Sequence, residues 1–172
     1  MILADTSAWV EYDRATGSPV DERLTELIRT DGPLAVTEPV IMEVVAGASS
    51  DRREADLRRL LLRFALLRFD AAADFDAAAS IYRSCRRAGV TPRGMVDCLI
   101  ASVAHRHQAA LLASDTDMSR VGKVIGIDLD DASLTACASR RVIPTPSVSG
   151  PGGHRKWDIG ATPQRDPTTS HP

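Results

Sequence analysis

Short apolar runs alternate with amphipathic segments along the first 134 residues of the chain. Apolar runs of strand length, each bounded by polar or turn-forming residues, predict strands at 2–4, 34–37, 66–69, 110–113 and 124–129. Apolar side chains at helical spacing predict a helix from about residue 6, helices at 18–30, 38–48, 51–65, 73–88 and 94–107, and a short helical turn at 116–121. Strands that alternate with helices predict an α/β fold, a three-layer α/β/α arrangement around a parallel sheet of four to five strands.

The character of the sequence changes after residue 134. Residues 135–172 contain many Pro, Gly, Ser and Thr residues and show no apolar periodicity. Such a segment cannot bury enough apolar surface to offset the entropy lost on ordering it. We therefore expect one globular domain over 1–134 and a disordered, functionally silent tail over 135–172.

Composition narrows the class of protein. The 172-residue chain is 44% hydrophobic and 26% charged, as globular proteins are, and its formal net charge is -2. Nucleic-acid-binding domains are usually basic, so any contact with nucleic acid must depend on local basic patches. Three widely spaced cysteines, Cys85, Cys98 and Cys137, match no disulfide framework and favour a reducing cytoplasm. The sequence shows neither a signal peptide nor an apolar run long enough to span a membrane.

Two aspartates come directly after predicted strands. Asp5 follows the run 2–4, and Asp115 follows the run 110–113, in the segment SDTD. Either residue could be a helix N-cap, because Asp is a favoured residue at that position. Either could also be a ligand at the carboxyl edge of a parallel sheet, where open α/β folds place their binding sites.

Two acids interrupt apolar helical segments. Glu43 lies in the segment EPVIMEVVAGA, which predicts a buried helix, and Asp97 lies in GMVDCLIASVA. A buried carboxylate is costly unless a cation, a hydrogen-bond donor or a metal ion partners it. A salt bridge to an arginine would explain Glu43 without a function, and the helix dipole alone would favour an ionised Asp97. We interpret both as functional residues.

The four carboxylates Asp5, Glu43, Asp97 and Asp115 can meet at one edge of the predicted sheet. Clustered carboxylates repel one another, and a hard divalent cation with oxygen ligands would compensate for that repulsion. No His or Cys residue has the spacing of a zinc site, so the ligands favour Mg²⁺, with Mn²⁺ as an alternative. Such a site suits phosphodiester hydrolysis, because the ion acidifies a bound water and neutralises charge on the phosphate.

These motifs resemble a known family. The segments DTSA at 5–8, DCLIAS at 97–102 and DTD at 115–117, with Glu43 between the first two, resemble the PIN domain. Within that family they are most similar to the VapC-type toxins of bacterial type II toxin–antitoxin pairs. The resemblance covers residues 1 to about 134 and implies a PIN-like fold with a metal-dependent endoribonuclease activity.

The resemblance also implies roles for the acids and for partners. It implies catalytic roles for all four carboxylates. Mg²⁺ would be held at Asp5 and Asp97 with support from Glu43 and Asp115, and Asp117 matches a further acid near the metal. Similar toxins cleave RNA, often tRNA or rRNA, are silenced by a cognate antitoxin protein, and usually form homodimers. The same properties are therefore expected of this chain.

Substrate binding requires donors near the acidic cluster. Arginines concentrate in 52–68 and 83–93, and a guanidinium group can bind phosphate bidentately. Most of these arginines are expected on solvated helix faces. Arg93 is the expected exception because it lies four residues before Asp97, and Thr6 and Ser114 are the expected hydroxyl contacts.

Two other functions stay open at this point. The chain could be a PIN-like nuclease that processes RNA or DNA without a toxin role. It could also be a non-catalytic module that binds RNA or a protein, in which case Asp5→Ala and Asp97→Ala would not change its effect in cells. A cysteine nucleophile is rejected, because Cys98 and His105 lie roughly 10 Å apart along one helix axis, too far for a nucleophile–base hydrogen bond.

Overall fold

A short parallel sheet organises the fold. The computed structural model describes residues 1–139, with side chains as far as Thr135. Its strands are β1 (Ile2–Ala4), β2 (Leu34–Val36), β3 (Ala65–Leu66) and β4 (Ala110–Leu112). They form one sheet in the order β3-β2-β1-β4, in which every neighbouring pair is parallel. The predicted α/β class and its parallel sheet are confirmed.

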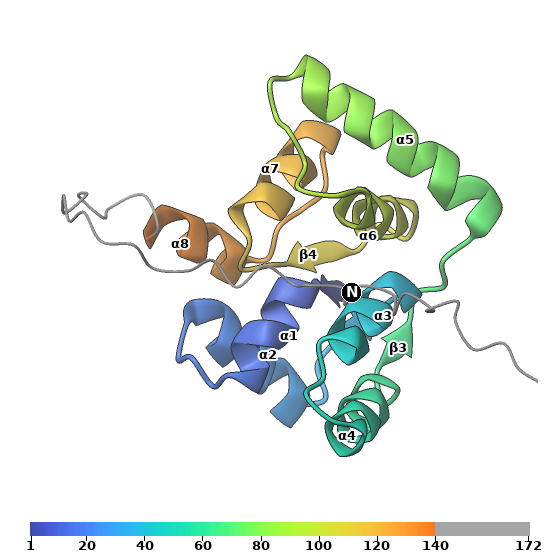
Figure 1. The fold of residues 1–172 in the computed structure, drawn as a ribbon. Helices are drawn as coiled ribbons and strands as arrows, with labels where there is room; N and C mark the ends of the chain where they lie inside the picture. The colour runs from blue at the N-terminus through green and yellow to red at the C-terminus, as the bar shows by residue number, and fades with distance from the viewer. Residues whose placement is uncertain (140–172) are drawn as a thin grey trace, which may run out of the picture.

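Helices cover the sheet in two groups. The helices are α1 (Thr6–Asp13), α2 (Pro19–Arg29), α3 (Glu38–Ala46), α4 (Asp51–Leu61), α5 (Ala71–Arg87), α6 (Met95–Arg106), α7 (Thr116–Ile125) and α8 (Asp131–Ser139). Helix α1 contacts α2 and α3, whereas α6 contacts α5 and α7. Figure 1 shows α5, α6 and α7 on one side of β4, with α1 and α2 on the other. The sheet is therefore enclosed between helices, as parallel sheets usually are.

The central strand places the first acid of the chain. In β1, Leu3 pairs with Ala35 of β2 and with Leu111 of β4, and all three side chains are buried. Because the strands are parallel, the carboxyl ends of β1 and β4 lie at the same edge of the sheet. The backbone N–H of Asp5 continues the ladder and donates to the carbonyl of Leu112 at 2.9 Å.

Side-chain caps start several helices where the sequence predicts them. Ser18 accepts from the N–H of Asp21 at the start of α2, and Pro19 occupies the first turn. Asp70 accepts from the N–H groups of Ala72 and Ala73 and begins α5 earlier than the apolar pattern indicated. These caps use donors that a helix cannot satisfy internally.

The predicted fifth strand at 124–129 is wrong. Helix α7 continues through Ile125 and ends where Gly126 adopts a left-handed conformation with φ 76°. Beyond it, Leu129 makes only an isolated parallel bridge with Leu111. A short apolar run does not distinguish strand from helix by its periodicity, and the cap at Asp115 begins a helix longer than the predicted turn at 116–121.

The last described helix was not predicted. Helix α8 (Asp131–Ser139) crosses the predicted domain boundary at residue 134 and contacts α2, α7 and β4. Buried Ser133 fixes it to the sheet, accepting from the N–H of Ala113 at 2.9 Å and donating to the carbonyl of Leu111 at 3.2 Å. The rest of the predicted tail, 140–172, lies outside the described residues. Within residues 1–139, no helix is both long enough and apolar enough to span a bilayer.

Candidate functional site

Asp5 is a buried carboxylate at the end of β1. Its side chain is 4% exposed, and its Oδ2 atom accepts from the backbone N–H of Ser7 at 3.0 Å and from the Ser7 hydroxyl at 2.5 Å. Burial raises the pKa of Asp5 to about 6; the Ser7 bonds oppose that rise, and the charges of Asp97 and Glu43 add to it. Asp5 is therefore both an N-cap of α1 and a carboxylate whose charge is poorly compensated.

The second acid of the candidate site, Asp97, lies in the first turn of α6. Its Oδ2 atom accepts from the backbone N–H of Gly94 at 3.1 Å, so the carboxylate also caps its own helix. Desolvation raises the pKa of Asp97; the Gly94 bond lowers it, Glu43 and Asp115 raise it further, and Arg93 lowers it. Asp97 therefore lies within electrostatic range of Glu43 and Asp115, and Asp5 lies within range of Asp97 and Glu43.

Glu43 reaches the site from α3. Its Oε2 atom accepts from the hydroxyl of Thr6 at 2.5 Å, which links α3 to the first residue of α1. The predicted burial of α3 is only partly confirmed, because Met42 is 53% exposed and Glu43 itself is half-buried. Its printed partner within the described residues is the Thr6 hydroxyl, so the alternative of a salt bridge to an arginine gains no support. Thr6, expected to contact substrate, orients Glu43 in this structure.

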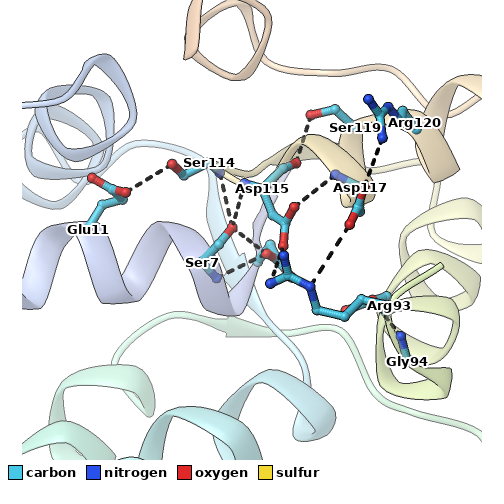
Figure 2. A network of polar contacts seen from close by, with 11 residues as sticks. Ser7, Glu11, Arg93, Gly94, Ser114, Asp115, Asp117, Ser119 and Arg120 are labelled. Carbon is cyan, nitrogen blue, oxygen red and sulfur yellow. Dashed lines mark hydrogen bonds and ion pairs between the residues drawn. The ribbon is translucent and has the colours of Figure 1, made fainter. Parts of the chain in front are cut away.

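Ser7 joins the two strand ends that supply Asp5 and Asp115. Its hydroxyl donates to Asp5 and accepts from the backbone N–H groups of Ser114 at 3.0 Å and Asp115 at 3.2 Å (Figure 2). These contacts hold the loop after β4 against the first turn of α1. Sequence reasoning missed this role; the only available signal was a hydroxyl two residues after a strand-ending Asp.

Asp115 and Asp117 begin α7, and both face arginines. Asp115 caps the helix by accepting from the N–H of Asp117 at 2.8 Å, and its Oδ2 atom lies 3.2 Å from Nη1 of Arg93. Asp117 lies 3.9 Å from Nε of Arg93 through Oδ2 and 3.1 Å from Nη1 of Arg120 through Oδ1. Figure 2 shows the Arg93 guanidinium reaching from the chain beside α6 toward both aspartates.

Ser114 does not face the acidic cluster as a substrate contact would. It is buried, and its hydroxyl donates to Oε1 of Glu11 at 3.0 Å (Figure 2). Its backbone N–H is used by Ser7. The structure therefore gives Ser114 a part in positioning the loop after β4, and the predicted contact with substrate gains no support.

The donor chemistry of the cluster fits a hard divalent cation. Asp5 accepts hydrogen bonds only through Oδ2, and among the described residues no donor is bonded to Oδ1. All ligands on offer are carboxylate oxygens, which suit Mg²⁺ or Mn²⁺ rather than zinc. Within residues 1–139, no three His, Cys, Asp or Glu side chains already stand as a ligand set. Binding of an ion therefore requires the carboxylates to close around it.

An open pocket adjoins the cluster on one side. It has a volume of about 730 Å³ and is bounded by α1, α3 and α4, with Thr6, Trp9, Glu43, Arg53 and Leu57 among its lining residues. Thr6 and Glu43 also belong to the acidic site, so the pocket opens directly beside it. Its lining is mostly apolar with a few charged side chains, which suits an organic ligand or an inserted side chain better than a small ion.

A comparison with known protein families identifies the family of this chain. The profile of the PIN domain matches residues 2–124, which include the four carboxylates Asp5, Glu43, Asp97 and Asp115. The chain belongs to the PIN-domain family.

Curated relatives specify the group within that family. Ribonuclease VapC11 of Mycobacterium tuberculosis is 44% identical to this chain over 128 residues, which are 74% of this chain and 96% of that protein. These values place the chain among the VapC ribonucleases of the PIN-domain family. VapC ribonucleases with PIN domains generally depend on a divalent metal ion.

Solved structures share the fold. VapBC2 from Rickettsia felis, bound to a DNA fragment from its promoter, matches with a TM-score of 0.59 and 18% identity over 76% of this chain and 98% of the matched chain. DNA-bound VapBC from Salmonella typhimurium matches with a TM-score of 0.59 and 20% identity over 75% of this chain and 96% of the matched chain. At these identities the likeness establishes the fold alone.

Proposed function

We propose that this chain is the toxin of a toxin–antitoxin pair, a Mg²⁺-dependent endoribonuclease that hydrolyses phosphodiester bonds in RNA. One observation supports the metal site above all: Asp5 is buried at the end of the central strand, next to other acids and without a paired cation among the described residues. The ribonuclease activity of the VapC relatives supports the choice of RNA.

The carboxylates would have different roles in the reaction. Asp5 and Asp97 would hold Mg²⁺, with Asp115 in support and Asp117 beside it; Mn²⁺ suits the same oxygen donors. When bound, the ion supplies charge neutralisation at the scissile phosphate and a more acidic water. Glu43 would orient the attacking water and accept its proton at Oε1, because Oε2 is engaged by the Thr6 hydroxyl.

The pocket beside the acidic site is where we propose that a protein partner binds. A cognate antitoxin would cover the pocket lined by Trp9 and Leu57 and block access of RNA to Glu43. Structural neighbours that are toxin–antitoxin complexes support such a partner. We also expect a homodimer, which light scattering of the purified chain would measure directly.

The test compares cleavage by the purified full chain with cleavage by Asp97→Asn. With Mg²⁺ and cellular RNA as substrate, wild type should cleave at discrete positions, and Asp97→Asn should lose more than about 10²-fold, the loss typical even of residues that only support a metal ligand. Asp76→Asn is the matched control, because it removes an exposed carboxylate on α5 away from the site. It should cleave as wild type does.

Parallel arms separate this proposal from the other functions. Full cleavage in the presence of a chelator would refute the metal mechanism. Cleavage of single-stranded DNA rather than RNA would indicate a DNA-directed nuclease, and growth arrest by Asp97→Asn equal to that by wild type would indicate a non-catalytic binding module. Mapping of RNA ends from cells that express the wild type would then locate the cut.

A further inference from the structure

Arg93 places a positive charge in the acidic site. Its Nη1 atom lies 3.2 Å from Oδ2 of Asp115, and its Nε atom lies 3.9 Å from Oδ2 of Asp117. Its charge also acts on Asp97, four residues later. Figure 2 shows the guanidinium directed toward Asp115 and Asp117.

The pairing of Arg93 is close but weakly anchored. The side chain is 74% exposed, so it can turn away without breaking a packed interior. An exposed ion pair of this kind contributes little stability by itself. Arg93 therefore neutralises the carboxylates without being fixed there, which is what a replaceable counter-charge requires.

We propose that Arg93 is the resident counter-cation of the metal site, which a divalent ion displaces from Asp115 and which then binds the phosphate of the RNA. The inference rests on the proposed function of the site. A guanidinium on Asp115 and a dication held by Asp5 and Asp97 repel each other, so the two cations cannot both occupy the cluster at full strength. Once released, the planar guanidinium suits bidentate contact with a phosphate.

The geometry implies that loss of Arg93 changes metal binding and RNA binding in opposite directions. Removal of Arg93 removes a competitor for the carboxylates, so the metal ion should bind more tightly. The same change removes a phosphate contact, so RNA should bind less tightly. A residue with only a structural role would not strengthen metal binding when it is lost.

The first experiment measures Mn²⁺ binding to the RNA-free full chain by electron paramagnetic resonance. Arg93→Ala should bind Mn²⁺ about three- to tenfold more tightly than wild type, as expected for loss of one charge a few ångströms from a dication in partly solvated surroundings. Arg120→Ala is the matched control. It also removes an arginine paired with Asp117, but from the outer side of α7, and should change the affinity by less than about twofold.

The second experiment follows the release itself. In a ¹⁵N spectrum, the Nε–H signal of Arg93 should shift as Mg²⁺ is added and should shift again when a non-cleavable RNA is added. At saturating Mg²⁺, Arg93→Ala should raise KM for RNA at least severalfold, and Arg93→Lys should restore part of that loss because it keeps the charge.

The outcomes distinguish this inference from the proposed function. Equal or weaker Mn²⁺ binding by Arg93→Ala, with normal binding by wild type, would overturn the counter-cation role and leave the metal site standing. An Nε–H signal that ignores Mg²⁺ would overturn the displacement. Absence of Mn²⁺ binding by wild type would overturn the metal site and this inference with it.

Discussion

Two buried carboxylates in this protein, Asp74 and Asp5, have opposite electrostatic surroundings. Asp74 in α5 is 1% exposed and accepts from Nε and Nη2 of Arg106 at 3.0 and 2.7 Å. Its second partner is the N–H of Asp70 at 2.7 Å, and these bonds outweigh desolvation, so the pKa of Asp74 is lowered. Asp5 is 4% exposed, and within the described part of the chain Ser7 alone donates to it; burial raises its pKa to about 6.

The difference separates a carboxylate whose charge the fold compensates from one whose charge it leaves uncompensated. The Asp74–Arg106 pair joins α5 to α6, and Arg106 also donates to the carbonyl of Arg68 at 2.6 Å, so the fold provides the counter-charge. At Asp5 the fold provides further negative charge instead. A buried acid that other acids surround is stable in its charged form only when a cation arrives from outside the fold.

The largest expected effect is a reversal of sign in stability. In chelator, Asp74→Asn should destabilise the protein by about 1.5–3 kcal/mol, because a buried carboxylate that accepts charge-assisted hydrogen bonds from Arg106 becomes a neutral amide. Asp5→Asn should stabilise the metal-free protein by up to about 3 kcal/mol at pH 7.5, since it removes a buried charge and keeps a good helix cap. Urea unfolding measures both changes.

Two further measurements check that reversal. Mg²⁺ should raise the stability of wild type by mass action and should leave Asp5→Asn nearly unchanged. Asp74→Asn should still cleave RNA under conditions where it is folded. Destabilisation by Asp5→Asn in chelator would contradict the view that this carboxylate is uncompensated.

The pH dependence of stability should separate the two acids as well. Because the pKa of Asp5 is raised in the folded state from 3.8 to about 6, the folded metal-free protein binds a proton more tightly than the unfolded chain does. This favourable contribution is complete below about pH 4 and is lost as pH rises through about 6. The stability gap between Asp5→Asn and wild type should therefore close as pH falls from 7.5 to 4.

Asp74 should show the opposite trend. Its lowered pKa means that its contribution is present at neutral pH and is lost on acidification. The difference in unfolding free energy between wild type and Asp74→Asn should therefore decrease as pH falls, because wild type loses stability there. Parallel curves for wild type and Asp5→Asn between pH 4 and 7.5 would show that Asp5 does not titrate as described.

The smallest expected effect concerns Ser7, which shapes the site without acting as a ligand. Ser7→Ala should weaken Mn²⁺ binding by about tenfold, within the range typical of residues that support a metal ligand, because Asp5 and the Asp115 loop lose their shared hydroxyl. Ser7→Thr should restore much of it. Ser133→Ala is the control, since it removes a buried hydroxyl with two backbone partners elsewhere on the β4 segment. If Ser133→Ala weakened Mn²⁺ binding as much as Ser7→Ala does, a specific role for Ser7 would be contradicted.

Much of the fold could be predicted because it depends on local pattern. Apolar runs and caps predicted β1, β2, β4 and most helices, and parallel pairing follows from their alternation. The run at 124–129 misled because helix and strand bury short apolar segments equally well. Helix α8 was missed because its composition is unremarkable and its attachment to β4 through Ser133 is a long-range contact.

The sequence by itself determined which acids are candidates for the site. Asp5 and Asp115 end strands, and Asp97 and Glu43 interrupt apolar helices, so their residue types and spacing were enough to name them. Only the tertiary structure decided their surroundings: that Ser7 joins two strand ends, that Glu43 is half-exposed, and that Arg93 lies over Asp115. Side-chain position along a strand or helix is set by local geometry, whereas charge compensation depends on residues distant in the sequence that only folding brings together.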